Sequence, residues 1–324
     1  MLFHPPKNPV ELKVLHLNEA QKQRREDLME ATQGKAALKQ FKKVMAKKAK
    51  KALKSKNKKK DADNKSQVFV LDFDGDIKAT AVKHLREEIS TLISTANKGD
   101  EVIVRLESGG GLVHGYGLAA AQLARLKDAD LKLTVCVDKV AASGGYMMAC
   151  VADNIIAAPF AIIGSIGVVS QLPNFHKWLK NHDVDYEMFT AGDYKRTVTV
   201  FGENDAEDRA KYQEELEQTH ELFKHFVNTY RPALEVAKVA TGEHWYGEDA
   251  LKLNLIDSLQ TSDSYILERM ENSDVYALHS RQKPTLAEKL GLAQAAEATL
   301  SMAVDKLPDA LARFDLNSRL NILK

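Results

Sequence analysis

From residue 67 to residue 169 the chain alternates short apolar segments with amphipathic ones, and this alternation constrains the fold more than any other feature. The apolar segments are rich in Val, Ile and Leu and are bounded by turn residues, as strands are. The amphipathic segments have the length and apolar spacing of helices. The expected strands lie at 67–75, 101–107 and 131–140, and the expected helices at 82–98, 114–129 and 144–153. This order predicts an α/β fold with largely parallel strands.

Composition indicates an ordinary globular core within the 324 residues, of which 44% are hydrophobic and 28% charged. The longest apolar stretch, 155–169, is too short and too interrupted by Gly and Pro to cross a bilayer. The first ten residues lack the apolar region of a signal peptide. Cys136 and Cys150 lie in apolar surroundings without a CxxC motif, which predicts buried free thiols.

Charge is distributed unevenly along the chain. Residues 31–60 contain 13 lysines and no acidic residue, whereas residues 61–324 contain 28 basic and 40 acidic residues. Apolar positions are too sparse in residues 1–66 for a core, so we expect a basic arm that is helical or disordered. Such an arm fits a solubilising tail or a contact with an anionic membrane surface. Nucleic acid is not expected as a partner, because Phe41 is the single aromatic residue of the lysine-rich stretch that could stack on a base.

Two motifs suggest a phosphatase and a zinc site, but their details support neither. The sequence VFVLDFDGD at 68–76 resembles the nucleophile loop of haloacid-dehalogenase-type phosphatases, in which the first Asp, here Asp72, is phosphorylated. Asp76 replaces the usual Thr, and no later acidic pair for Mg²⁺ is recognisable. His220 and His225 are five residues apart, about 140° around a helix, so no zinc site is expected.

A glycine-rich loop at 108–111 follows one expected strand and precedes a helix. His114 stands where a dinucleotide-binding fingerprint needs its third glycine, so a nucleotide cofactor is not predicted. The free backbone amides at such a helix start can still bind an anion or an oxyanion. His114 fits either a catalytic base or an ordinary residue of the first helical turn.

Ser143 is the candidate nucleophile. It follows a strand that ends at Val140 and precedes a helix, within the small-residue sequence AASGG, and such a turn can expose a hydroxyl. The helix start favours the negative charge that develops during acyl transfer. Ala141 departs from the Gly-x-Ser-x-Gly elbow of α/β-hydrolases, and Tyr146 departs from the Ser-x-x-Lys motif. Downstream histidines at 176 and 244 lie in no recognisable catalytic loop.

A lysine made neutral by burial is the remaining choice of base. An exposed lysine has a pKa near 10.4 and therefore keeps its proton at neutral pH. Full burial lowers the pKa of a lysine by roughly 3 to 5 pH units. The base must therefore come from a segment that packs into the interior, and not from the basic arm. Lys195 follows an expected strand at 184–189 and a glycine turn, within a run of Thr, Val and Phe, and is one of several candidates.

Several separated stretches resemble the signal peptide peptidase A (protease IV) family of serine peptidases. They are ESGGGLVHGYGLAAAQL, VDKVAASGGYMMACVADNIIAAPFAIIGSIGVV and TAGDYKR, and they occur in this order. The lysine-rich arm and the stretch VATGEHWYGEDALKLNLID are most similar to the SohB branch of that family. The resemblance covers residues 67–265. It implies a Clp-protease/crotonase-like fold, a superhelix of ββα units that assembles into homo-oligomers.

The resemblance also implies roles for five residues. Ser143 would be the nucleophile, Lys195 the general base, and Ser165 a hydrogen-bonding partner that orients the lysine amine. The backbone amides of Gly144 and Gly111 would form the oxyanion hole. No metal and no cofactor is implied. Family members usually have Ser-Pro-Gly-Gly in the loop, and here a glycine takes the proline position, which removes no donor because proline has none.

We therefore expect a basic arm over 1–66, a catalytic peptidase domain over 67–265 and a helical C-terminal extension over 266–324. The expected function is hydrolysis of peptide bonds through an acyl-enzyme, in signal-peptide remnants or in damaged or membrane-associated proteins. The partners would be a peptide or unfolded-protein substrate, further copies of the chain, and a membrane surface that the basic arm contacts. The resemblance implies association with a bacterial inner membrane through an anchor outside this chain. An inactive scaffold or an acyl-CoA-handling protein of the same fold is the alternative.

Overall fold

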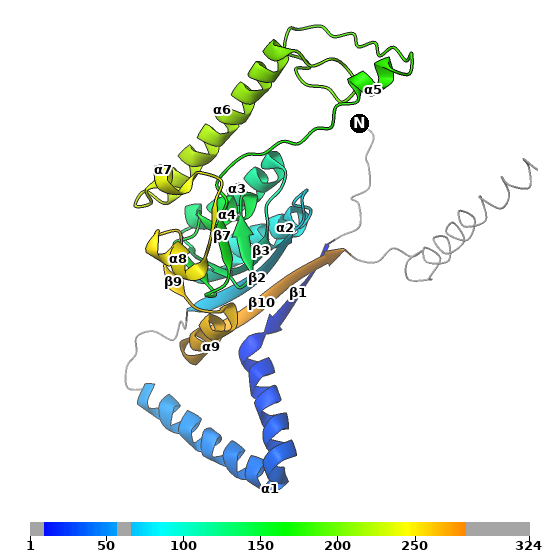
Figure 1. Ribbon diagram of the computed structural model, residues 1–324. Helices are drawn as coiled ribbons and strands as arrows, with labels where there is room; N and C mark the ends of the chain where they lie inside the picture. The colour runs from blue at the N-terminus through cyan, green and yellow to red at the C-terminus, as the bar shows by residue number, and fades with distance from the viewer. Residues whose placement is uncertain (1–9, 57–65, 283–324) are drawn as a thin grey trace, which may run out of the picture. The chain divides into compact units, whose positions relative to one another are not determined.

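The computed structural model describes residues 10–56 and 66–282, and a ten-stranded sheet forms the centre of this part of the chain (Figure 1). The main path of the sheet has the order β1-β10-β2-β3-β4-β6-β9, while β5 pairs with β3 and β7, and β7 pairs with β8. The pairs from β10 across to β9 are parallel, as are those of β5, whereas β7 and β8 are antiparallel. The predicted α/β fold with a largely parallel sheet is confirmed.

The strands are β1 (Val10–His16), β2 (Gln67–Gly75), β3 (Glu101–Ser108), β4 (Lys132–Val137), β5 (Val140–Ala142), β6 (Asn154–Ala157), β7 (Ile162–Gly164), β8 (His244–Tyr246), β9 (Ser258–Leu259) and β10 (Asp274–Gln282). The helices are α1 (Leu17–Lys56), α2 (Val82–Thr95), α3 (Val113–Asp128), α4 (Gly144–Ala149), α5 (His176–Lys180), α6 (Ala206–Tyr230), α7 (Val236–Val239), α8 (Gly247–Lys252) and α9 (Ser262–Asn272).

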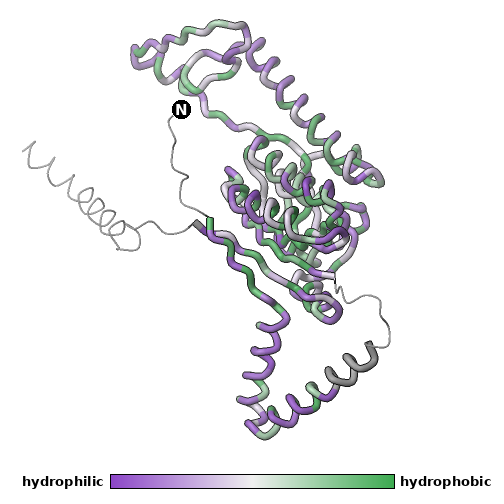
Figure 2. The backbone as a smooth tube through the Cα atoms, turned by 180° about the vertical axis from the view of Figure 1, so that it is seen from behind, coloured by the Kyte–Doolittle hydropathy of each residue, from purple (hydrophilic) through white to green (hydrophobic). Residues whose placement is uncertain are grey.

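Alternating side chains of β2 show how both faces of the sheet are buried. Phe73 is buried against α3, where its ring meets the edge of Tyr116 at a centroid distance of 6.4 Å. Val68 and Val70, on the opposite face, belong to a buried cluster that includes Tyr265 of α9. The hydrophobic residues gather in this compact region, whereas hydrophilic residues dominate α1 (Figure 2).

The chain divides into two compact units. Residues 13–279 form the larger unit, which contains every candidate site residue. The other unit comprises residues 1–12 and 280–324, of which 10–12 and 280–282 are described. Within it, Arg281 forms an ion pair with Glu11 at a nitrogen–oxygen distance of 3.0 Å. No helix of the described ranges 10–56 and 66–282 is both long and apolar enough to span a membrane.

The expected secondary structure differs from the structure in the two segments that flank residues 67–265. Most of the basic arm is helical, but residues 10–16 form strand β1, whose sequence VELKVLH alternates apolar and charged residues with the period of a strand. The expected C-terminal extension begins inside α9, and residues 274–282 form β10, which pairs with β2 instead of being helical. Residues 184–189, expected as a strand, are in neither helix nor strand. The rest of the extension, 283–324, lies outside the described residues.

Candidate active site

Ser143 occupies a strained turn between β5 and α4. Its backbone has φ 51° and ψ −119°. Residues other than glycine rarely adopt this conformation, which costs of order 1–3 kcal/mol. The turn is fixed because the Ser143 amide donates to the Gly164 carbonyl (2.8 Å) and the Met147 amide donates to the Ser143 carbonyl (2.9 Å). The Ser143 side chain does not cap α4, and it lines a cavity. Its hydroxyl is thus held at a surface that a substrate can reach.

The two glycines after Ser143 allow α4 to pack closely against its neighbours. A Cβ atom on Gly144 would come within 2.4 Å of the Tyr116 ring, and one on Gly145 within 2.4 Å of the Ser108 carbonyl oxygen. Real Cβ atoms do not approach other atoms so closely, so both positions require glycine. Gly144 is the first residue of α4, and its amide therefore has no acceptor within the helix.

A chain of hydrogen bonds fixes the glycine loop beside this turn. The Gly110 amide donates to Ser108 Oγ (3.1 Å), the hydroxyls of Ser108 and Tyr116 are 2.5 Å apart, and Tyr116 donates to the Asp76 carbonyl (2.7 Å). Burial raises the pKa of the Tyr116 hydroxyl, which keeps it a donor. Ser108 must then donate to Tyr116 and accept from Gly110, so the chain has one direction.

This network decides which loop amide remains free. The Gly110 amide is occupied by Ser108, whereas the Gly111 amide has no acceptor among the described residues. Gly110 has φ +89°, and a Cβ atom there would lie 2.7 Å from the Gly144 nitrogen, so the loop lies directly against the start of α4. Gly111 and Gly144 both line the cavity beside Ser143. Two free amides next to a hydroxyl are the arrangement that stabilises an oxyanion.

Ser165 belongs to the same site. It follows Gly164, has φ 51° and lines the cavity, and its amide donates to the Glu243 carbonyl (2.7 Å). The following carbonyl, that of Ile166, lies 3.2 Å from Nε2 of His220 on α6. The structure therefore brings four of the five expected site residues together around one cavity.

The cavity has a volume of about 940 Å³ and is lined mainly by apolar side chains. The apolar lining consists of Ile77, Leu112, Val113, Met147, Val168, Val169, Leu222, Phe223 and Phe226. A cleft of this size holds several residues of an extended peptide, and its apolar walls exclude water from the serine and the two amides.

Two family models match the chain: peptidase family S49 over residues 125–276, and the N-terminal model of peptidase family S49 over residues 4–123. A probable protease SohB of Haemophilus influenzae is 56% identical over 240 residues, which is 74% of this chain and 68% of that protein. The chain belongs to peptidase family S49. A probable protease SohB of Buchnera aphidicola subsp. Schlechtendalia chinensis is 58% identical over 206 residues, which is 64% of this S49 chain and 68% of that protein.

Among solved structures, this S49 chain is similar to a mutant of the 1510-N membrane-bound stomatin-specific protease in complex with a substrate peptide. The sequence identity is 14% and the TM-score 0.43, over 70% of this chain and 96% of the other.

Lys195 is the expected site residue that the single S49 chain does not bring to the cavity. Its side chain is exposed, it does not line the cavity, and its amide donates to the Gly192 carbonyl (3.2 Å). Its neighbour Tyr194 lies under Lys211 in the first turns of α6, with Nζ 4.9 Å from the ring centroid. The part of α6 that lines the cavity begins at Thr219, which is eight residues, or about 12 Å, further along that helix than Lys211. The expected burial of this lysine is therefore wrong for the single chain.

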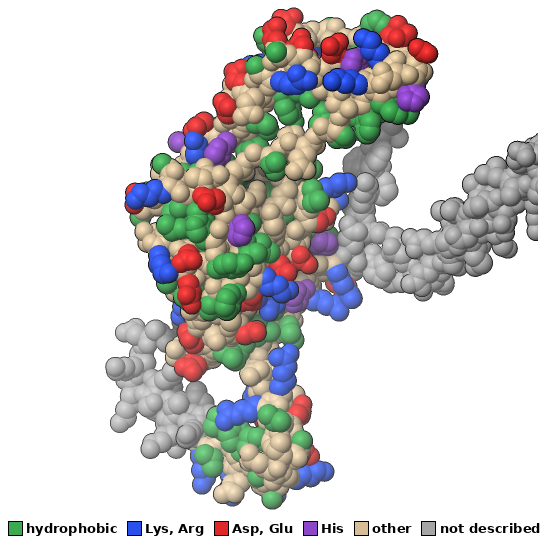
Figure 3. All heavy atoms as spheres, viewed as in Figure 1, with side chains coloured by type: hydrophobic (Ala, Val, Ile, Leu, Met, Phe, Trp, Pro, Cys, Tyr) green, Lys and Arg blue, Asp and Glu red, His purple; other side chains and the backbone are tan. Residues whose placement is uncertain are grey.

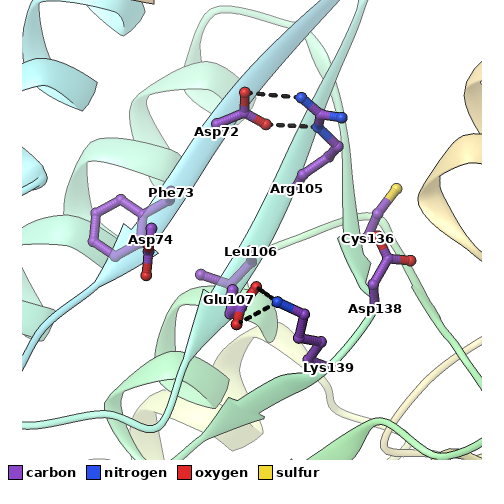
Figure 4. A pocket seen from close by; sticks show the side chains of 9 residues that line it. All are labelled: Asp72, Phe73, Asp74, Arg105, Leu106, Glu107, Cys136, Asp138 and Lys139. Carbon is purple, nitrogen blue, oxygen red and sulfur yellow. Dashed lines mark hydrogen bonds and ion pairs between the residues drawn. The ribbon is translucent and has the colours of Figure 1, made fainter.

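The other sequence candidates lie outside the cavity. His114 is exposed in the first turn of α3 and does not line it. Asp72 accepts two hydrogen bonds from Arg105, at 2.6 and 2.9 Å, in a separate hollow of about 300 Å³ on the sheet (Figure 4). Its carboxylate is thus already paired. No metal-binding group of His, Cys, Asp or Glu occurs in residues 10–56 and 66–282.

Three residues of the site were not found by reading the sequence. Ser108 and Tyr116 order the glycine loop, and their eight-residue separation across a loop and a helix gives no recognisable pattern. His220 was considered only as half of a zinc motif, but its position on α6 places it at the cavity.

Proposed function

We propose that the chain is a serine endopeptidase in which Ser143 is the nucleophile. The observation that carries this proposal is the strained turn of Ser143 beside the free amides of Gly111 and Gly144, in a cavity of peptide size. Strain of this kind is retained at functional sites, where surrounding contacts fix it. Membership of a peptidase family agrees with the same chemistry.

The proposed reaction has two halves. Neutral Lys195 takes the proton of the Ser143 hydroxyl as the oxygen attacks a peptide carbonyl, and the Gly111 and Gly144 amides hold the oxyanion. The lysine then passes its proton to the leaving amine, which leaves an acyl group on Ser143. Water, deprotonated by the same lysine, attacks the ester and releases the acid product and free serine. Ser165 orients the lysine amine.

We also propose that assembly of several copies completes the site. The segment of residues 169–195, which carries Lys195 at its end, exposes large apolar side chains. Val169 is 80%, Trp178 57%, Phe189 89% and Tyr194 58% exposed. In Figure 3 hydrophobic side chains appear among the charged ones at the top of the view, where this segment lies. Exposed apolar patches mark interaction surfaces. Covering this one would move the amine of Lys195 out of water, which favours its neutral form.

The finer fold assignment and the location are part of the same proposal. The run β2-α2-β3-α3-β4, with β5 and β7 turning out of the main sheet path, fits the stacked ββα units of Clp-protease and crotonase folds. The apolar cavity fits an extended peptide or unfolded protein as substrate. The lysine-rich arm supports association with a membrane surface.

A serine-reactive phosphonate probe tests the dyad on the whole chain. We expect labelling at Ser143, identified by mass spectrometry of the modified peptide, and no labelling of Ser143→Ala. Lys195→Ala should slow labelling by about a hundredfold or more, the usual effect of losing a general base. Lys180→Ala, an exposed lysine of the same segment, is the matched control and should label normally. Equal labelling of wild type and Lys195→Ala would reject the lysine, and an unlabelled wild type would favour an inactive scaffold.

Mixing two inactive variants tests whether assembly supplies the base. If a neighbouring copy brings Lys195 to the cavity, chains carrying Ser143→Ala mixed with chains carrying Lys195→Ala should recover peptidase activity that neither has alone. No recovery in verified mixed oligomers would show that each chain uses its own lysine.

A further inference from the structure

Helix α1 is bent sharply at Gly34, which has φ 82° and ψ 168° and separates two helical arms, residues 17–33 and 35–56. The two arms form a V in Figure 1. Glycine is needed at the bend because its φ lies in the left-handed half of the map. We call residues 17–56 the basic hairpin, because its second arm lies entirely within the stretch that contains 13 lysines and no acid.

Contacts near the bend fix the second arm against the first. Lys42 forms an ion pair with Glu26 at 2.8 Å, and the Arg25 guanidinium lies 4.6 Å from the centre of the Phe41 ring. Leu38, on the same face of the second arm, is only 9% exposed. The faces of the second arm therefore have defined orientations, which a disordered tail would not give them.

The start of the first arm is bonded to α9, β10 and the residue between them in the larger unit. The Asn18 side-chain amide donates to the carbonyls of Met270 (3.1 Å) and Ser273 (3.0 Å), and its oxygen accepts from the Val275 amide (2.8 Å). Leu17 packs against the buried cluster beneath α9. The hairpin thus has a fixed root on the domain that contains Ser143.

Lys39, Lys43 and Lys47 form a row along the second arm. They are four residues apart, so they lie on one face of the helix, and all three are exposed. Unlike Lys42, none of them has an ion-pair partner among the described residues. Figure 3 shows the blue side chains of Lys and Arg gathered over α1 at the bottom of the view. A row of unneutralised cations is suited to a surface with many anionic groups.

Exposed apolar side chains on the hairpin favour a lipid surface over a nucleic acid. On the second arm Val44, which is 46% exposed, lies three residues before Lys47 and flanks the row, and on the first arm Leu28 is 65% exposed. Exposed apolar residues among lysines are typical of helices that lie in the headgroup region of a bilayer. Binding of single-stranded nucleic acid without sequence preference uses free aromatic rings. Phe41 is the single aromatic residue of positions 17–47, and Arg25 covers its ring.

We propose that the basic hairpin docks on bilayers that contain anionic lipid, through the row of Lys39, Lys43 and Lys47. The proposal gives the membrane association proposed above a defined surface and rests on that association, but not on the peptidase chemistry. The hydrogen bonds of Asn18 fix the hairpin to the rest of the larger unit. Docking through the hairpin would therefore place the unit that contains Ser143 next to the membrane.

Binding to vesicles tests the proposal with the full chain. We expect co-sedimentation with vesicles of phosphatidylcholine and phosphatidylglycerol, and not with phosphatidylcholine alone. The triple variant Lys39→Gln, Lys43→Gln and Lys47→Gln should bind about a hundredfold more weakly, because each lysine near an anionic surface contributes roughly a factor of five. Raising the salt from about 0.1 M to about 1 M shortens the screening length from about 10 Å to about 3 Å and should release the wild type.

Two matched variants separate charge at this row from charge in general. The triple Lys→Arg variant at positions 39, 43 and 47 keeps the charges and should bind as the wild type does. Lys83→Gln, Lys177→Gln and Lys180→Gln together remove the same charge from exposed lysines elsewhere and should also bind normally. Normal binding by the Gln variant of the row overturns the proposal, as does equal binding to neutral vesicles or binding only to a single-stranded oligonucleotide. Reaction of each variant with the phosphonate probe is measured in parallel, so a failure here is distinguishable from a failure of the peptidase proposal.

Discussion

The amide of Ser143 donates a hydrogen bond of 2.8 Å to the carbonyl of Gly164, the residue directly before Ser165. Both serines have φ 51°, and the strands that carry them, β5 and β7, are paired in parallel. One hydrogen bond between two strand ends therefore sets the separation of the candidate nucleophile and the serine proposed to orient its base. Strain at two linked positions indicates a site that the surrounding structure holds in place.

Replacing Ser143 by glycine should make the protein more stable and inactive. Glycine adopts the backbone conformation of this turn without steric cost, which outweighs its larger loss of entropy on folding and leaves a gain of about 1 kcal/mol. For a domain of this size, we expect the melting temperature to rise by about 2–4 °C. Ser143→Ala keeps the Cβ atom and is the control, inactive but unchanged in stability. Equal melting temperatures for the two variants would show that the turn is not strained.

Tyr116→Phe should reduce turnover by about tenfold to a hundredfold with little change in KM. It removes the donor to the Asp76 carbonyl and the acceptor for Ser108, so the glycine loop loses its fixed position beside Ser143. The effect should fall on kcat, because the loop amide acts on the oxyanion of the transition state.

The control for this variant is Tyr265→Phe, which removes another buried hydroxyl, bonded to Glu101 in the cluster beneath α9. Both variants should lose about 1–2 kcal/mol of stability, as expected when a buried hydrogen-bonding group is left unpaired. Only Tyr116→Phe should lower kcat. A similar loss of kcat in both would mean that the Tyr116 effect is general destabilisation.

Local features of the site were predictable from the sequence because they depend on neighbouring residues. Small residues between a strand and a helix indicated the Ser143 turn. Strand β10 was missed because it pairs with β2, about 200 residues earlier in the chain, and a strand at this distance leaves no local signal beyond its own alternation. The exposure of Lys195 was missed because a neutral lysine requires a covered environment, and one chain does not provide it.

Neither cysteine should react with iodoacetamide at pH 8 while the protein is folded. Cys136 and Cys150 are free and buried, as the sequence predicted. Burial raises the pKa of both thiols, so the reactive thiolate is scarce at this pH and is also inaccessible. Both should be alkylated in guanidinium, which mass spectrometry detects as two added groups. Rapid modification of the native protein would show that one of the two thiols opens to solvent.

Gly144→Ala should destabilise the protein by about 3 kcal/mol and abolish labelling of Ser143. The added methyl group would come within 2.4 Å of the Tyr116 ring, so either α4 or α3 must shift, and the amide at the start of α4 shifts with it. Gly117→Ala is the control, because a Cβ atom there meets nothing within 4 Å and alanine is the better helix former by up to about 1 kcal/mol. In the double variant Gly144→Ala with Tyr116→Ala, the two ring carbons that the methyl group would meet, Cγ at 2.4 Å and Cδ2 at 2.7 Å, are absent. The two substitutions should then cost less together than the sum of their separate effects, as measured by chemical denaturation. Additive costs would show that the tyrosine ring is not what restricts residue 144 to glycine.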